Sequence, residues 1–139
     1  MLEFIVDYFP SPLESRPRTA TRDGESVEVA PDPSAPFSAS CFKIMVDPFV
    51  GKLSFIRVNS GTLTSDNTIY NVNKHEDERI SSSKFMTGKA GKDVMEIVVG
   101  DLLPLPNLQN VTFGQLLGRK WVRLLYPPVV VPKPVFRVV

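Results

Sequence analysis

The residues of this chain whose types suit catalysis are few, and their spacing matches no catalytic arrangement. The single histidine, His75, stands in the polar run 75–79, and a zinc protease would need a second histidine where Arg79 stands. A serine nucleophile is not supported, because no serine lies between glycines with the spacing of a nucleophile elbow. The pattern favours His75 as a surface residue beside a hydrated acidic turn, and it predicts no catalytic residue and no metal site.

Nucleotide chemistry has one weak candidate, the segment 88–93, which reads Gly-Lys-Ala-Gly-Lys-Asp. A GTPase needs a glycine-rich loop of defined spacing, followed by a lysine and a hydroxyl residue that holds magnesium. The segment lacks the first-glycine spacing, and no hydroxyl residue follows Lys92. We interpret it as the solvated tip of a hairpin. The sequence therefore predicts no GTP binding, no cofactor and no enzymatic activity for this chain.

Basic and aromatic side chains, which together can bind RNA, alternate along the middle of the chain. They are Lys43, Lys52, Arg57, Arg79, Lys84, Lys89 and Lys92, with Phe42, Phe49, Phe55 and Phe85. Such groups bind phosphates by charge and bases by stacking. The alternative is a domain with aromatic residues in its core and lysines in a solvated rim. Pattern alone favours this second interpretation.

Length, charge and cysteine content narrow the class of protein. A chain of 139 residues suits one domain, and a net charge of +1 gives no overall field to attract DNA or a membrane surface. No apolar run approaches the ~18 residues that a membrane span needs. The single cysteine, Cys41, excludes an internal disulfide and suits a reducing cytosol. We expect a cytoplasmic protein that binds neither DNA nor membrane, with Cys41 as a small, unreactive strand residue.

The stretch 42–61 reads as two long strands joined by a tight corner. Period-2 alternation places one set of side chains on one face of the first strand, namely Phe42, Ile44 and Val46. Pro48 and Gly51 bracket the reversal, and glycine tolerates the positive φ that a hairpin corner often needs. We predict a long hairpin with a positive φ at Gly51.

Two stretches precede this hairpin. Apolar residues recur with helical spacing on one stripe, and they are Leu2, Ile5, Val6 and Phe9. Pro10 and Pro12 end the helix after about two turns, which is marginal alone in water, so the stripe needs another surface to cover. The stretch 14–35 is rich in Pro, Ser, Thr and charge, with a turn at Asp23-Gly24. We expect a largely irregular or mobile linker there, with only a weak signal for an edge strand at Val27 and Val29.

Short strand-like segments with turn signals between them fill the rest of the chain. The expected strands are 68–71, 79–86 and 94–99, and the connections are a polar turn at 73–78, a tip at 87–93 and Gly100-Asp101. Pro104 and Pro106 then predict that the strand 102–108 is interrupted or exposed on one side, because proline cannot donate to a ladder. The expected fold class is all-β, a small closed antiparallel β-barrel with a short N-terminal helix and irregular termini.

Residues 41–63, Cys-Phe-Lys-Ile-Met-Val-Asp-Pro-Phe-Val-Gly-Lys-Leu-Ser-Phe-Ile-Arg-Val-Asn-Ser-Gly-Thr-Leu, closely resemble the opening of the second domain of bacterial elongation factor G. The resemblance continues through 68–71, 78–80, 85–86, 99–102, Leu108 and 112–114. Residues 2–13 resemble the last helix of that family's GTPase domain, and 131–136 resemble the connection to its third domain. Departures are Pro104 and Pro106, Gln115 in place of the usual Asp, and the segment 118–123, which has no counterpart.

The resemblance implies a non-catalytic module of a ribosomal translocation GTPase, which docks on small-subunit rRNA and on the GTPase domain. Its implied domains are a GTPase-domain helix remnant (1–13), a linker (14–36), the barrel (37–120) and a linker with the first strand of a missing domain (121–139). The expected rRNA-binding residues are Lys43, Lys52, Arg57, Arg79 and Lys84. The expected interdomain residues are Leu2, Ile5, Val6 and Phe9. Two alternatives remain open, a stand-alone OB-like barrel that binds single-stranded RNA and an inactive truncated fragment.

Overall fold

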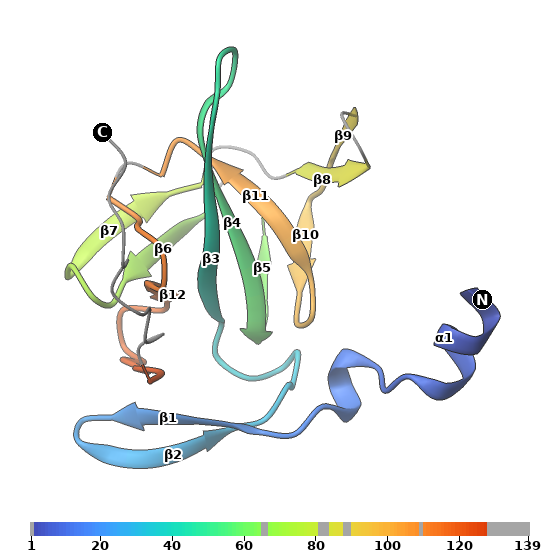
Figure 1. Cartoon of the computed structure of the whole chain (residues 1–139). Coiled ribbons are helices and arrows are strands. Elements are labelled where there is room, and N and C mark those ends of the chain that lie inside the picture. Colours follow the sequence, from blue (N-terminus) through green and yellow to red (C-terminus); the bar gives the residue numbers. More distant parts are fainter. Residues whose placement is uncertain (1, 65–66, 81–83, 88–89, 109, 128–139) are drawn as a thin grey trace, which may run out of the picture.

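The computed structural model describes residues 2–64, 67–80, 84–87, 90–108 and 110–127 of a mostly β chain (Figure 1). The helices are α1 (Leu2–Tyr8) and the 3-10 turn η1 (Pro12–Glu14). The strands are β1 (Arg18–Arg22), β2 (Glu25–Val29), β3 (Ser38–Asp47), β4 (Gly51–Ser60), β5 (Thr62–Thr64), β6 (Thr68–Asn71), β7 (Glu76–Arg79), β8 (Lys84–Thr87), β9 (Ala90–Asp93), β10 (Glu96–Val98), β11 (Leu102–Pro106) and β12 (Leu116–Gly118).

A six-stranded antiparallel sheet in the order β11-β4-β3-β12-β6-β7 curls around the core as a half-barrel (Figure 1). Three two-stranded sheets, β1-β2, β5-β10 and β8-β9, lie beside it. The expected closed barrel is not seen in the described residues. The short strands β5 and β10 pair with each other and not with an edge of the large sheet, so the described ladder stays open. The β-rich class and the short N-terminal helix are as predicted.

The β3–β4 hairpin extends beyond the rest of the sheet (Figure 1) and has the predicted corner. Asp47 pairs with Gly51, which adopts a φ of 83°, so the positive φ expected there is confirmed. The Asp47 carboxylate accepts hydrogen bonds from the backbone N–H groups of Val50 and Phe49, at 2.9 and 2.8 Å. These two donors hold the pKa of Asp47 below its ordinary value, because they stabilise the charged form.

A β-bulge in β3 breaks the side-chain alternation that the sequence predicts. The register with β4 shifts between Cys41 and Lys43, which leaves Phe42 without a partner residue. Cys41 is therefore buried in the core, and Ile44, three residues on, packs against the same core. Phe42 and Val46 are exposed. The prediction that Phe42, Ile44 and Val46 share one face of a regular strand is wrong at Phe42, because the extra residue resets the period.

The core lies on the concave side of the curled sheet. Its members are apolar, and they are Phe37, Ala39, Cys41, Ile56, Val58, Leu63, Ile69, Ile80, Ile97, Val99, Leu103, Leu105, Leu108, Val111 and Leu117. Burial raises the pKa of the Cys41 thiol, because it disfavours the thiolate that would react. Cys41 is thus the small buried strand residue that the sequence predicts.

Strand β11 carries both unexpected prolines and forms one edge of the six-stranded sheet. Pro104 lies opposite Phe55 and Pro106 lies opposite Leu53 in its single ladder, with β4. An edge strand has one side free of ladder hydrogen bonds, so it tolerates residues that cannot donate. The prediction of a strand exposed on one side is confirmed.

The stretch 14–35, expected to be irregular or mobile, forms the β1–β2 hairpin. Asp23 and Gly24 make its turn, with φ values of 51° and 92°. Thr21 and Leu125 also exchange two backbone hydrogen bonds, which fasten β1 to the segment that follows β12. This long-range pairing and the buried side chain of Ala20 order a stretch whose composition resembles a linker. The weak strand signal at Val27 and Val29 was the correct one.

The acidic turn and the strand after it differ from the prediction. The turn spans 72–75, and Glu76 and Asp77 already belong to β7, which ends at Arg79. Glu78 is buried, and its Oε1 accepts a hydrogen bond from the backbone N–H of Asn110 at 2.8 Å. The expected hydrated run therefore contains one structural carboxylate. The predicted strand 79–86 is split, since β8 begins only at Lys84; Gly88 and Lys89 of the predicted tip lie outside the described residues.

The N-terminal helix α1 extends away from the sheet (Figure 1), and none of its residues is buried. The following 3-10 turn does contact the β-domain, at the turn between β10 and β11, because Pro12 lies so close to Gly100 that a Cβ there would overlap its ring. Packing on the β-domain thus begins near Pro12. The predicted strand at 131–136 lies outside the described residues.

Removal of residues 1–9 is expected to change the free energy of unfolding by less than about 1 kcal/mol, because the helix buries nothing against the sheet. Urea denaturation of the shortened and full chains measures the difference. A loss of several kcal/mol would show that the helix belongs to the core.

Candidate nucleic-acid interface

The five predicted rRNA-binding residues do not form one cluster. Lys43 on β3 and Arg57 on β4 are exposed on adjacent strands. Arg79 is exposed on β7, and β3, β12 and β6 lie between β4 and β7 in the sheet order. Lys84 lies on β8, in a separate two-stranded sheet, and its side chain is not described. Only Lys43 and Arg57 therefore remain candidates for a common surface on β3 and β4.

Lys52 makes a hydrogen bond within the protein. Its Nζ donates a hydrogen bond to the backbone carbonyl of Val111 at 2.6 Å. This contact ties the start of β4, next to the hairpin corner, to the loop between β11 and β12. Charge reversal at Lys52 would break that contact, so Lys52 is a poor position for testing RNA binding separately from stability.

Aromatic side chains lie on the outer face of β3 and β4. The rings of Phe42 and Phe55 are 6.4 Å apart, and Lys43 Nζ lies 5.7 Å from the centroid of Phe55. Phe49, at the hairpin tip, is 96% exposed. The interpretation that places these aromatic residues in the core is therefore wrong for Phe42 and Phe49. The outer face combines aromatic rings with positive charge.

A hollow of about 420 Å³ lies beside these rings, and we call it the outer groove. It is lined chiefly by Arg18, Phe42, Arg57, Leu102, Phe113 and Tyr126. Three of its apolar side chains are about half exposed, with values of 43% for Phe42, 57% for Leu102 and 50% for Phe113. Its volume lies within the ~300–1,000 Å³ of small-molecule pockets. Arg18, Phe113 and Tyr126 were not predicted, because long-range pairing brings them to β3 and β4.

The loop that carries Phe113 is held by hydrogen bonds to Gln115, which reach the buried side chain of Asn71. Gln115 Oε1 accepts hydrogen bonds from Asn71 Nδ2 and from the backbone N–H of Thr112, both at 2.9 Å. The backbone N–H of Gly114 donates to the carbonyl of Cys41 at 2.8 Å, beside the bulge. These bonds place Phe113 near Phe42. Gln115, where the resemblance leads one to expect Asp, supplies two acceptor contacts that position the groove wall.

Tyr126 is a further lining residue of the outer groove. Its hydroxyl and the Ser38 hydroxyl are 3.1 Å apart, and Ser38 also contacts the Ser60 hydroxyl at 2.7 Å. Burial raises the pKa of Tyr126, while the Ser38 contact and the positive charge of Arg18 oppose that rise. Arg18 and Tyr126 both line the outer groove.

A second, smaller hollow adjoins the outer groove, and we call it the Asn59 hollow. Its lining includes Arg16, Arg18, Arg57 and Asn59, and its volume of about 10 Å³ has room for one water-sized group. Asn59 is 7% exposed, and its side-chain Oδ1 has no hydrogen-bond partner. Arg18 and Arg57 line both hollows. The two hollows thus form one positively charged depression with an apolar end.

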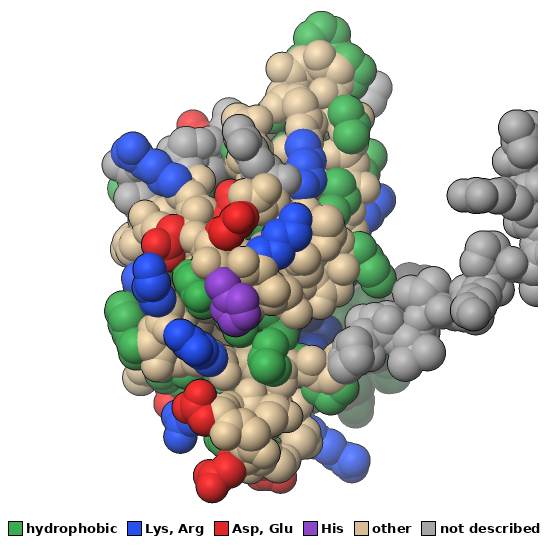
Figure 2. Space-filling view, turned by 90° about the vertical axis from the view of Figure 1, so that its left-hand side faces the viewer, with side chains coloured by type: hydrophobic (Ala, Val, Ile, Leu, Met, Phe, Trp, Pro, Cys, Tyr) green, Lys and Arg blue, Asp and Glu red, His purple; other side chains and the backbone are tan. Residues whose placement is uncertain are grey.

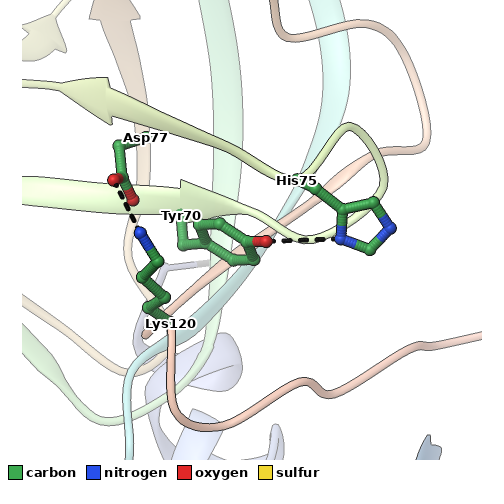
Figure 3. Close-up of polar contacts among 4 residues, drawn as sticks. All are labelled: Tyr70, His75, Asp77 and Lys120. Carbon is green, nitrogen blue, oxygen red and sulfur yellow. Dashed lines mark hydrogen bonds and ion pairs between the residues drawn. The ribbon is translucent and has the colours of Figure 1, made fainter.

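The side of the molecule around His75 has a different character. Figure 2 shows Lys and Arg side chains interleaved with Asp and Glu around the histidine. His75 is exposed, its Nδ1 lies 3.3 Å from the Tyr70 hydroxyl, and Lys120 pairs with Asp77 at 3.1 Å (Figure 3). An exposed ion pair contributes little to stability. His75 is the surface residue that the sequence predicts, and the mixed charges give no single-sign field on this side.

Two other classes of site are not found in the described part of the chain. No group of three or more His, Cys, Asp or Glu residues there could hold a metal ion. No helix among the described residues is long and apolar enough to cross a membrane.

Comparison with known proteins decides the family. The family model for elongation factor G domain 2 matches residues 36–118, more than half of the chain. The chain belongs to the elongation factor G domain 2 family. Elongation factor G of Neorickettsia sennetsu is 34% identical over 139 residues, which cover 99% of this chain and 20% of that protein. The chain thus spans about a fifth of the length of this relative.

A solved structure agrees with the fold of this domain 2 chain. A crystal structure of a Thermus thermophilus protein matches with a TM-score of 0.64 and 25% sequence identity, over 85% of this chain and 15% of the other. The matched residues 36–118 of the domain 2 family contain Phe42, Arg57 and Phe113, whereas Arg16 and Arg18 precede them. The depression therefore combines residues of the family domain with residues from the segment before it.

Proposed function

We propose that this chain is a non-catalytic module of a translation elongation factor G-like protein, and that it docks on small-subunit rRNA in the cytoplasm. The match of residues 36–118 to elongation factor G domain 2 carries the proposal. The exposed basic and aromatic side chains on β3 and β4 support an RNA contact, because they offer charge for phosphates and rings for bases. We assign Lys43 and Arg57 to this contact, with Arg79 and Lys84 as separate, outlying positions and Lys52 as a support.

The N-terminal stripe supports a second contact, with the GTPase domain of the full-length protein. Leu2, Ile5, Val6 and Phe9 are all exposed on or beside α1. An apolar stripe of this kind on a two-turn helix gains stability only when another surface covers it. We therefore propose residues 1–13 as the end of a GTPase domain, 14–36 as a connecting hairpin, 37–120 as the docking domain, and 121–139 as the connection to a further domain.

Co-sedimentation with purified bacterial small ribosomal subunits tests the proposal. We expect the chain to sediment with the subunits at low salt and to be released as salt rises, because phosphate contacts exchange with counterions. Reversal of Lys43 and Arg57 to Glu is expected to weaken this binding at least tenfold, with Lys74→Glu, on the exposed turn before β7, as the matched control.

The alternatives predict other results. A stand-alone RNA-binding barrel would bind free single-stranded RNA as tightly as it binds small subunits, whereas a docking module would bind the subunits more tightly, and an inactive fragment would bind neither. Saturable binding of a fluorescent GTP analogue would contradict the assignment of a non-catalytic module.

A further inference from the structure

We propose that the outer groove and the Asn59 hollow together bind one unpaired nucleotide of an RNA chain. In this arrangement Arg18 and Arg57 hold its phosphate, Phe42 and Phe113 contact its base, and Asn59 accepts a hydrogen bond from its ribose. The inference rests on the proposed function for the nature of the partner. It adds which part of the RNA is bound and which residues bind it.

The positive charge around the Asn59 hollow favours a bound anion. Arg16, Arg18 and Arg57 line the Asn59 hollow and are exposed. Among the residues that the structure describes, no acidic side chain pairs with any of the three guanidinium groups. Like charges gathered around one hollow repel each other, and a bound anion relieves that repulsion. Arginine matches the oxygen geometry of phosphate with two parallel hydrogen bonds, so a phosphate is the anion that suits this cluster.

The buried amide of Asn59 favours a ligand that donates a hydrogen bond. Asn59 Nδ2 makes a 3.4 Å contact with the Ser40 hydroxyl, whereas Oδ1 has no partner and is removed from solvent. A buried acceptor without a donor is costly, so a ligand that supplies a donor is favoured there. An ionised phosphate supplies none, but the 2′-hydroxyl of ribose does. The small volume beside Asn59 suits a single hydroxyl. The amide therefore favours RNA over DNA.

The apolar end of the outer groove favours an unpaired base. In the sheet register Leu102 lies opposite Arg57, and Arg57 lies opposite Ser40, so the apolar wall adjoins the guanidinium directly. Phe42 and Phe113 flank this row and are each about half exposed. Aromatic faces bind bases by stacking, without regard to sequence. Only an unpaired base can reach such a groove, because duplex RNA keeps its bases stacked inside.

Direct binding by the whole chain tests the inference. The probe is a fluorescein-labelled oligouridine of about six nucleotides, and fluorescence anisotropy gives Kd for it and for the matching deoxyribo-oligomer. We expect the RNA to bind at least about fivefold more tightly than the DNA, and Asn59→Ala to abolish that difference. Arg18→Gln and Arg57→Gln should each weaken RNA binding about tenfold, and Phe113→Leu about fivefold. Each arginine variant should also make the salt slope shallower by about 0.7.

The control variant is Lys74→Gln, which removes one exposed charge outside both hollows and should leave Kd unchanged within about twofold. A melting curve accompanies each variant. If Arg18→Gln does not fold, Arg18→Lys replaces it, since lysine keeps the charge and loses the two-point phosphate contact.

Three outcomes would overturn the inference. Equal binding of RNA and DNA would remove the role of Asn59, and wild-type affinity in both arginine variants would remove the phosphate site. Absence of oligonucleotide binding would show that the groove is covered by protein or serves another partner. If the chain still sediments with small subunits in these cases, the proposed function stands and only this site is wrong.

Discussion

Gly61→Ala is expected to lower the free energy of unfolding by at least about 3 kcal/mol. Gly61 has a φ of 74°, a conformation that costs a residue with a Cβ about 1–2 kcal/mol. An added Cβ would also lie 2.5 Å from the Ala35 carbonyl oxygen and 2.6 Å from the Phe37 backbone. Because the obstructing atoms are backbone, they cannot turn aside. The close approach between the end of β4 and the chain leading into β3 would have to open.

Two other glycines distinguish the cost of a positive φ from the cost of steric overlap. Gly114 also has a positive φ, but a Cβ there meets nothing within 4 Å, so Gly114→Ala should cost only about 1–2 kcal/mol. Gly51→Ala should cost a similar amount, since its Cβ would lie 3.6 Å from Asn107, an ordinary contact. Urea denaturation of the three variants measures the order. Equal effects at Gly61 and Gly114 would show that the chain near Ala35 does not pack as described.

Asn71→Ala is expected to destabilise the protein by about 3 kcal/mol, the second largest effect. Asn71 is fully buried, and its amide donates to Gln115 Oε1 at 2.9 Å. Its Oδ1 accepts from the backbone N–H groups of Asn73 and Lys74, both at 3.2 Å. Alanine would leave these partners unsatisfied and a small cavity in place of the amide.

The matched control is Lys74→Ala in the same turn, whose exposed side chain should contribute less than about 0.5 kcal/mol. Urea denaturation of both variants measures the difference. Asn71→Ala should also loosen the loop that carries Phe113, because Gln115 holds that loop through Thr112. A small effect at Asn71 would mean that water replaces the amide, and the network would then not position the groove.

The central hairpin was predictable because its signals are local. The strand-like residues on both sides of Pro48 and Gly51 fix where the chain reverses, and Gly51 has the positive φ that such a corner needs. The prolines of β11 were predictive for the same reason, since a missing N–H restricts a strand to an edge. Local rules of this kind act through a few neighbouring residues.

Features that depend on distant partners were missed. The bulge at Phe42 reverses the side-chain pattern of β3, and no residue type marks it in the sequence. The β1–β2 hairpin has the composition of a linker, yet its pairing with Leu125 orders it. Whether the sheet closes into a barrel or stays a half-barrel depends on which strands pair across the chain. Turn signals in the sequence do not specify that pairing.

The candidate site shows the same division. Arg57 was predicted from the basic and aromatic alternation, whereas Arg16 and Arg18, which were assigned to the linker, line the Asn59 hollow just before and at the start of β1. Phe113 and Tyr126 reach the groove by packing over long sequence separations. Lys52, predicted to contact RNA, also donates a hydrogen bond to the carbonyl of Val111, a contact that its residue type does not reveal. Residue type indicates which side chains could contact RNA, while long-range strand pairing decides which of them lie together on the surface.

Competition on the small ribosomal subunit tests the central claim most directly. The fluorescently labelled chain is bound to purified small subunits at about 50 mM salt, and unlabelled full-length elongation factor G is added in excess. The account predicts saturable binding of the chain and its full displacement, because a domain 2 module and the complete factor would occupy the same RNA surface. Absence of binding at this salt, or binding that excess elongation factor G leaves unchanged, would contradict it.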